Sequence, residues 1–140
     1  MAQDQKYIVA PNSVSTAIKL MWASIAIGIP NSLYGLNVGA LKFSALFLVT
    51  MVVTIAIMSG LLIMISKGKN WARIIMFAMY ILGLFIAIPI MFNYFNTYII
   101  IGIMNVLQTV LQLIGFYLLY KKESNLWFRS MKLNKKPIAV

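Results

Sequence analysis

Four long apolar segments, separated by short polar connections, most strongly constrain how this 140-residue chain folds. They cover residues 14–36, 43–66, 72–92 and 98–120. About 20 residues at 1.5 Å rise cross the ~30 Å hydrocarbon layer, and backbone amides in lipid need partners within their own segment. None of the segments alternates polar with apolar residues, so a strand barrel is not expected. The sequence therefore predicts an all-α membrane protein, a single four-transmembrane-helix bundle over residues 1–140.

The composition agrees with a membrane environment, because 62% of the residues are hydrophobic and the mean hydropathy is +0.91. The first ten residues are polar, and a full-length apolar segment follows them without a small-residue cleavage site. A removable signal peptide is therefore not expected.

Positive charge predicts the orientation, since short cytoplasmic loops retain lysine and arginine. Of the 12 lysines and arginines, only Lys42 lies on one side, and the other eleven share the opposite side. Those eleven are Lys6, Lys19, Lys67, Lys69, Arg73, Lys121, Lys122, Arg129, Lys132, Lys135 and Lys136. We therefore expect a multi-pass protein of the bacterial inner (cytoplasmic) membrane, with both termini and the 67–73 turn inside, and with Lys42 and residues 93–97 outside. Lys19 is expected to extend its long stem to the inner surface.

Pro30 leaves two possibilities for where the first helix ends. Proline removes a backbone hydrogen bond, and the residues after it, "NSLYGLNVGA", suit a loop. The helix either kinks at Pro30 and continues, or stops near it.

The fourth segment carries a polar face inside the membrane. Asn105, Gln108 and Gln112 recur at intervals of three and four, with Thr109 beside them, so they share one side of a helix. We expect these amides to join helices by hydrogen bonds, with Thr50 and Thr54 as candidate partners; the alternative is a polar lining for a solute or lipid headgroup. Small residues four apart, at 56 and 60 and at 83 and 87, favour close helix packing.

The turn between the second and third segments concentrates polar and aromatic side chains. We expect Asn70 to cap the third helix, Trp71 to anchor it at headgroup depth, and Arg73 to hold phosphate or cap the carbonyl end of the second helix. The lysines of the turn, Lys67 and Lys69, are expected to contact anionic headgroups.

The tail, residues 121–140, is basic and can form an interfacial helix with Ser124 as its N-cap. Arg129 and Lys132 would lie on its polar face and Trp127 on its apolar face, with the helix resting on the inner membrane surface. The cations are explained by anionic lipid, and no nucleic-acid role is expected.

Residues that usually carry catalysis are scarce. The chain has no histidine, no cysteine and only two acids, Asp4 and Glu123. General acid/base catalysis needs a titratable group near the substrate, so we expect no enzyme, no metal site and no cofactor.

Two short motifs carry a resemblance: Lys69-Asn70-Trp71-Ala72-Arg73 between the second and third segments, and Trp127-Phe128 after the fourth. In these the chain resembles a loose group of small, uncharacterised four-transmembrane-helix bacterial inner-membrane proteins with a basic-x-Asn-Trp-Ala-Arg turn. The resemblance implies the architecture and no activity. Likeness to four-helix immunity proteins that protect bacteria from pore-forming toxins is limited to size and threading.

Two functions remain open from the sequence. The first is a non-enzymatic membrane protein that acts through helix-helix or protein-protein contacts, as an accessory subunit or an immunity-type protein with a membrane-protein partner or a second copy. The alternative is a small oligomeric transporter or channel for a polar solute or lipid, lined by the polar face of the fourth helix.

Overall fold

The computed structural model describes residues 9–133, and all regular structure in that range is helical. The helices are α1 (Asn12–Asn37), α2 (Ala45–Ser66), α3 (Asn70–Thr97), α4 (Ile99–Leu119) and α5 (Lys122–Leu133). The first four are each long and apolar enough to cross a membrane. The predicted all-helical class, with four helices long and apolar enough to cross a membrane, is confirmed for this range.

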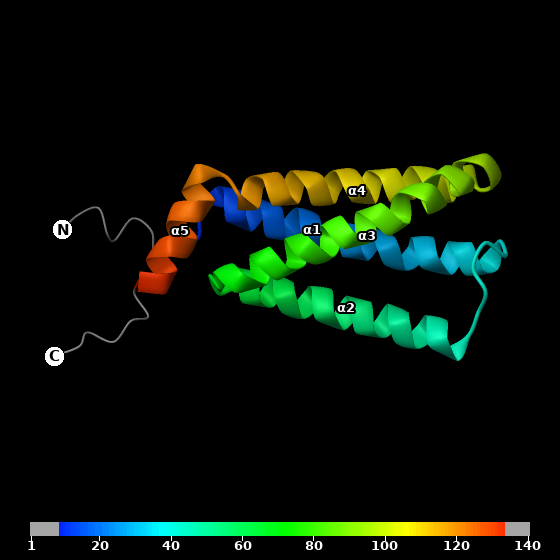
Figure 1. Cartoon of the computed structure of the whole chain (residues 1–140), viewed down its shortest axis with the longest axis horizontal. Coiled ribbons are helices and arrows are strands. Elements are labelled where there is room, and N and C mark those ends of the chain that lie inside the picture. Colours follow the sequence, from blue (N-terminus) through cyan, green and yellow to red (C-terminus); the bar gives the residue numbers. More distant parts are fainter. Residues whose placement is uncertain (1–8, 134–140) are drawn as a thin grey trace.

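The bundle has two different ends (Figure 1). At one end, here named the α5 end, α1 and α3 begin, α2 and α4 end, and α5 lies across them. The opposite end, named the loop end, holds the 38–44 connection between α1 and α2 and the sharp turn at Tyr98 between α3 and α4.

Two helices continue through proline. α1 contains Pro30 and runs on to Asn37, so of the two possibilities for this segment the helix continues. α3 contains Pro89 and extends to Thr97, so residues 93–97, expected as a loop, form its last turns. Proline is tolerated in membrane helices because neighbouring helices and hydroxyl side chains compensate the disrupted backbone. Beyond Pro30, Ser32 donates a 2.9 Å hydrogen bond to the carbonyl of Gly28.

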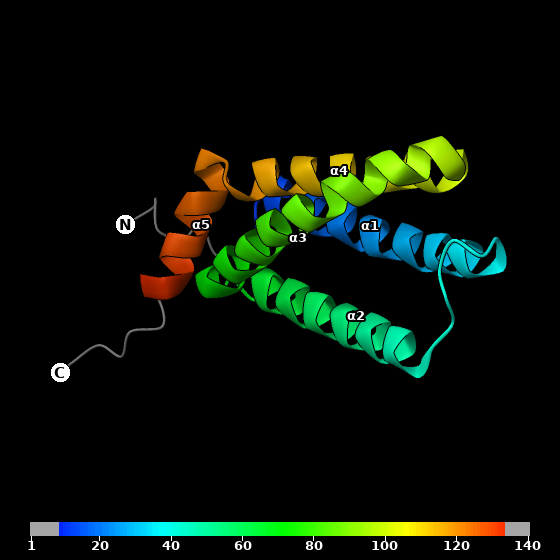
Figure 2. The same ribbon diagram turned by 45° about the vertical axis from the view of Figure 1, so that its right-hand side comes forward.

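The buried core lies almost entirely at the α5 end. Its members are Val14, Ala17, Met21, Leu61, Leu62, Ile65, Ala72, Met76, Phe116, Leu119, Trp127 and Phe128, which come from all five helices. Toward the loop end α1 stays beside α4, and α3 crosses from α2 to α4, whereas α2 diverges from α1 (Figures 1 and 2). The structure is therefore packed at one end and open between α1 and α2 at the other.

The α2–α3 turn is set by Gly68. Its φ of +73° belongs to the left-handed region that favours glycine. The Lys69 N–H donates to the carbonyl of Met64 at 3.0 Å, and the Gly68 N–H donates to that of Ile65 at 2.9 Å. These two bonds form a Schellman motif, which satisfies the last carbonyls of α2 and reverses the chain into α3.

Candidate functional site: a polar face between open helices

The polar face of α4 divides into two parts. Asn105 is joined to α1, because Asn31 Nδ2 donates a 2.9 Å hydrogen bond to Asn105 Oδ1. Thr109 bonds the Asn105 carbonyl of its own helix at 2.8 Å. The side-chain amides of Gln108 and Gln112 form no hydrogen bond with any group in residues 9–133. The expected bonding between helices therefore holds for Asn105, and the two glutamines remain open to another role.

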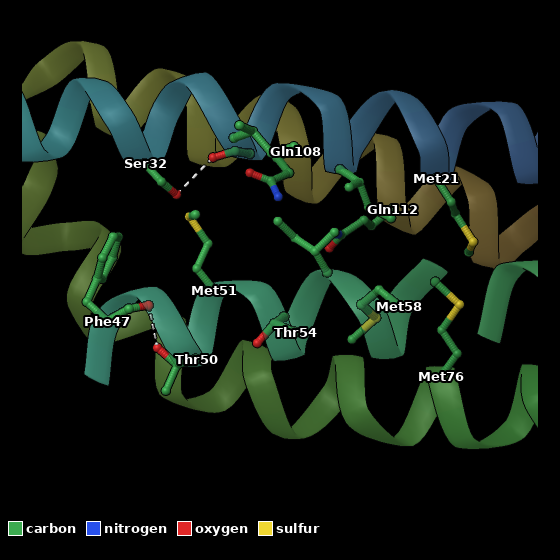
Figure 3. A pocket seen from close by; sticks show the side chains of 14 residues that line it. Met21, Ser32, Phe47, Thr50, Met51, Thr54, Met58, Met76, Gln108 and Gln112 are labelled. Atoms are coloured by element: carbon green, nitrogen blue, oxygen red, sulfur yellow. Dashed lines mark hydrogen bonds between the residues drawn. The ribbon is translucent and has the colours of Figure 1, made fainter. Parts of the chain in front are cut away.

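Gln108 and Gln112 project into the space between α1, α4 and α2 (Figure 3). They line a cavity of about 350 Å³ together with residues of α1, α2 and α3. Its other lining residues are Met21, Ile25, Gly28, Ile29, Ser32, Phe47, Thr50, Met51, Thr54, Ile55, Met58 and Met76. We call this the α1–α2 cavity. Its volume falls within the range of small-molecule sites, about 300–1,000 Å³.

A second cavity, of about 340 Å³, lies between α3 and α4 and is lined partly by Asn105, Thr109 and Tyr80. It shares four lining residues with the α1–α2 cavity, namely Met58, Met76, Gln108 and Gln112. The two glutamines therefore stand between two adjoining spaces.

The threonines of α2 do not pair with the amides. Thr50 and Thr54 line the α1–α2 cavity, as their expected depth requires. The Thr50 hydroxyl, however, donates to the Phe47 carbonyl one turn earlier at 2.9 Å. The predicted α2–α4 hydrogen bond is therefore absent among the described residues.

Arg73 forms the centre of a second constellation, at the α5 end. It is only 7% exposed, and its Nη1 donates to the Leu119 carbonyl at 2.8 Å and to Asn125 Oδ1 at 2.7 Å. Its guanidinium lies 4.6 Å from the ring centroids of both Tyr120 and Phe128. The expectation that Arg73 caps the carbonyl end of α2 is wrong, because Arg73 bonds a carbonyl at the end of α4. Its alternative role, holding phosphate, stays a prediction.

The rest of the turn differs from expectation in one further residue. Asn70 is the first residue of α3, whose N-cap is Lys69, and no side chain caps the helix. The predicted Asn70 cap is therefore wrong; its Oδ1 is buried without a hydrogen-bond partner among residues 9–133. Trp71 is 50% exposed, a position compatible with its predicted anchoring role. Lys67 is exposed and Lys69 is half-buried.

α5 is attached to the bundle by buried aromatic and hydroxyl groups. Trp127 and Phe128 are 2% and 1% exposed, so Trp127 packs against protein rather than standing on a lipid-facing side. The predicted Ser124 cap is wrong, because Ser124 lies inside α5 and donates to the Leu118 carbonyl at 2.6 Å. Since that bond uses its hydrogen, Ser13 must donate the 3.0 Å bond between the two hydroxyls.

The outer face of α5 is basic. Lys121, Lys122, Arg129 and Lys132 are exposed there or just before it. Arg129 and Lys132, expected on the polar face of this helix, are both exposed, and their contact with the membrane surface stays a prediction. Lys135 and Lys136 lie outside the described residues. No group of three or more histidine, cysteine, aspartate or glutamate side chains gathers within residues 9–133.

Sequence reasoning missed three participants in these sites. No partner was expected for Asn31, although an amide in an apolar segment is itself a signal for one. Ser13 and Phe128 gave weaker signals, because their roles depend on where α5 packs. The chain matches no protein-family profile, no curated protein and no solved structure. The resemblance carried by the Lys69–Arg73 turn therefore stays a prediction.

Proposed function

We propose that this chain is a non-enzymatic protein of the bacterial inner membrane that acts through contacts made within the bilayer, as an accessory subunit or an immunity-type protein. The observation that carries the proposal is the face that α2 turns away from the bundle. Met51, Met58 and Leu62 lie on the inward face, and helical spacing puts Ala56 and Gly60 on the opposite one.

The small residues of that face have no packing role within residues 9–133. Ala56 is exposed, and a Cβ added at Gly60 would meet no atom within 4 Å. Small residues four apart let two helix backbones approach closely in lipid, where packing and hydrogen bonds drive association. The outward face of α2 therefore offers a contact surface for a helix of a partner membrane protein or a second copy.

Photo-crosslinking in cells tests this contact. A photoreactive residue at position 56 should give a discrete crosslinked species, and the same residue at the exposed position 78 of α3 should not. Adding Gly60→Leu should remove the crosslink from position 56, while Ala78→Leu leaves it. Equal labelling from both positions, or a crosslink unaffected by Gly60→Leu, would reject the contact.

The same proposal places both termini in the cytoplasm. It is supported by the charges, because Lys67, Lys121, Lys122, Arg129 and Lys132 are exposed at the α5 end and Lys42 stands alone at the loop end of the described chain. The basic face of α5 would then meet anionic headgroups. Since the chain lacks cysteine, Lys42→Cys and Lys67→Cys can be labelled separately. An impermeant reagent on intact cells should modify position 42 and spare position 67. The reverse pattern would mean that the protein has the opposite orientation in the membrane.

The adjoining cavities favour a second candidate, a small oligomeric transporter or channel. Gln108 and Gln112 line both cavities and would supply the polar part of the lining along which a polar solute or lipid passes. Reconstituted protein should then show uptake that Gln108→Leu lowers without changing thermal stability. Unchanged uptake in the folded variant would remove this candidate and leave the contact function untouched.

A further inference from the structure

We propose that the α1–α2 cavity binds the head of a neutral, membrane-soluble lipid, whose carbonyl or hydroxyl oxygens bond the amides of Gln108 and Gln112. The proposal uses the cavity of the second candidate function but requires no transport through it. It is independent of the contact on the outward face of α2.

The amide chemistry indicates a ligand with hydrogen-bonding groups. Each glutamine amide presents donors and an acceptor, and neither Gln108 nor Gln112 has a partner within residues 9–133. A polar group in hydrocarbon is unfavourable when it lacks a hydrogen bond. Because the two residues lie one helical turn apart, their side chains can address two oxygens of one head group. A carbonyl accepts from the amide nitrogen, and a hydroxyl can also donate to the amide oxygen.

The lining restricts the ligand to a neutral one. All 14 lining residues are methionine, isoleucine, phenylalanine, glycine, serine, threonine or glutamine, so none of them carries charge. An ionised phosphate or ammonium would enter an apolar, low-dielectric space without a counter-charge, at a large desolvation cost. A neutral carbonyl or hydroxyl head pays no such cost.

The walls fit a head group that carries an apolar chain. Met21, Met51, Met58 and Met76 come from three helices, and their flexible side chains adapt to different shapes. Ile29, Thr50 and Thr54 line the cavity and are also exposed on the outside of the bundle. That outside is hydrocarbon for a membrane-spanning segment. The cavity therefore communicates with the bilayer, and a lipid can enter sideways between α1 and α2.

The Gln108 amide lies against Gly28 of α1. A Cβ built at Gly28 would lie 2.9 Å from Gln108 Nε2, so the amide rests directly against the α1 backbone. Alanine at this position would force the amide to move. Gly28 thus provides a way to disturb the site without deleting either glutamine.

Binding by purified protein, measured by native mass spectrometry, tests the proposal with three short-chain probes. Dioctanoylglycerol is neutral and offers a hydroxyl and ester carbonyls. Dioctanoyl phosphatidic acid has the same acyl chains with an anionic head. A quinone with a short isoprenoid tail is neutral and offers carbonyl acceptors only. Because the basic face of α5 can retain phosphatidic acid, the quantity compared is the binding lost in the Gln108→Leu, Gln112→Leu double variant.

The expected result is glutamine-dependent binding of at least one neutral probe, with each single Leu variant about three- to twentyfold weaker, the ratio for one membrane hydrogen bond. Gly28→Ala should weaken binding as well, and Val106→Leu, on the exposed face of α4, should not. Preference for the glycerolipid or the quinone identifies the source of the ligand.

Three results would overturn the proposal: no binding of either neutral probe, equal glutamine-dependent binding of phosphatidic acid, or unchanged binding in folded Leu variants. If the Leu variants fail to fold, Gly28→Ala decides the question in the same way. Binding without solute uptake would keep the lipid site and remove the transporter. The crosslink at position 56 reports on the contact function alone, because it does not depend on either glutamine.

Discussion

The pair formed by α1 and α4 and the single helix α2 show two ways in which an apolar segment can behave in this molecule. α1 and α4 stay together because Asn31 bonds Asn105 and because glycines let side chains of one helix reach the other, as at Gly115, where an added Cβ would lie 3.0 Å from Met21. α2 has no side-chain hydrogen bond to another helix among the described residues. It is buried only near its end, at Leu61, Leu62 and Ile65.

This difference follows from the solvent. Lipid tails are as apolar as leucine, so burying apolar side chains against another helix gains little, and hydrogen bonds and close packing decide which helices associate. α2 is apolar on all sides, and among the described residues its first turns make neither a side-chain hydrogen bond to another helix nor a close contact between helix backbones. The α5 end differs again, because Arg73, Ser124 and Trp127 bring polar and aromatic interactions to the helix ends. The firm contacts of α2 are therefore concentrated at the α5 end, and toward the loop end α2 stands apart from α1 and α4.

The largest effect should come from removing a buried ring at the α5 end. Phe128→Ala deletes a side chain that is 1% exposed and should lower the free energy of unfolding by about 3–5 kcal/mol. Phe92→Ala, at a site that is 70% exposed near the loop end, should change it by about 0.5 kcal/mol or less. Thermal unfolding in the same detergent measures both. Similar losses would show that the two ends are equally packed.

Arg73→Leu should have the next largest effect. It removes two hydrogen bonds and leaves the Leu119 carbonyl and Asn125 without their donor, for a loss of about 2–4 kcal/mol. Arg129→Leu, on the exposed face of α5, serves as the control and should cost about 0.5 kcal/mol or less. Arg73→Lys should recover only part of the loss, because a point charge lacks the planar fork. Equal melting of the Arg73 and Arg129 variants would contradict the assigned cap.

Alanine substitutions at two glycines with the same backbone conformation allow a finer comparison of packing at the two ends. Gly68 and Gly39 have φ values of +73° and +74°, so alanine should cost about 1–2 kcal/mol of backbone strain at each. A Cβ at Gly68 would also lie 2.9 Å from Met131, whereas Gly39 has no neighbour within 4 Å. Gly68→Ala should therefore unfold at a lower temperature than Gly39→Ala. The opposite order would mean that Met131 does not pack on the turn.

The smallest effects concern the polar face of α4. Asn105→Leu breaks the bond to Asn31 and should cost about 0.6–1.7 kcal/mol. The Gln108→Leu, Gln112→Leu double variant removes no hydrogen bond within residues 9–133, so its stability should fall less than that of Asn105→Leu or rise. Thermal unfolding of both variants without added lipid compares the two losses of stability. A larger loss in the double variant would show that the glutamines bond another helix or copy.

The helical class and the four spans were predictable, because length and hydropathy decide them. The proline-containing ends were not, since Pro30 and Pro89 weaken a helix locally and only its neighbours determine whether it continues. The glutamine face was predictable from spacing, but its lack of partners depends on how far α2 diverges. The role of Arg73 was not predictable either, because its acceptors, Leu119 and Asn125, follow it by 46 and 52 positions along the chain.

The central claim is that α1 and α2 are held together at the α5 end and separate toward the loop end, which opens the cavity to lipid. Distances between spin labels in lipid nanodiscs test it directly, since the chain has no native cysteine to remove. One pair, at positions 19 and 63, reports on the α5 end, and the other, at positions 33 and 48, reports on the loop end. A short, narrow distribution is expected for the first pair and a longer, broader one for the second. Equal and narrow distributions would show a bundle that is closed at both ends and would contradict this claim.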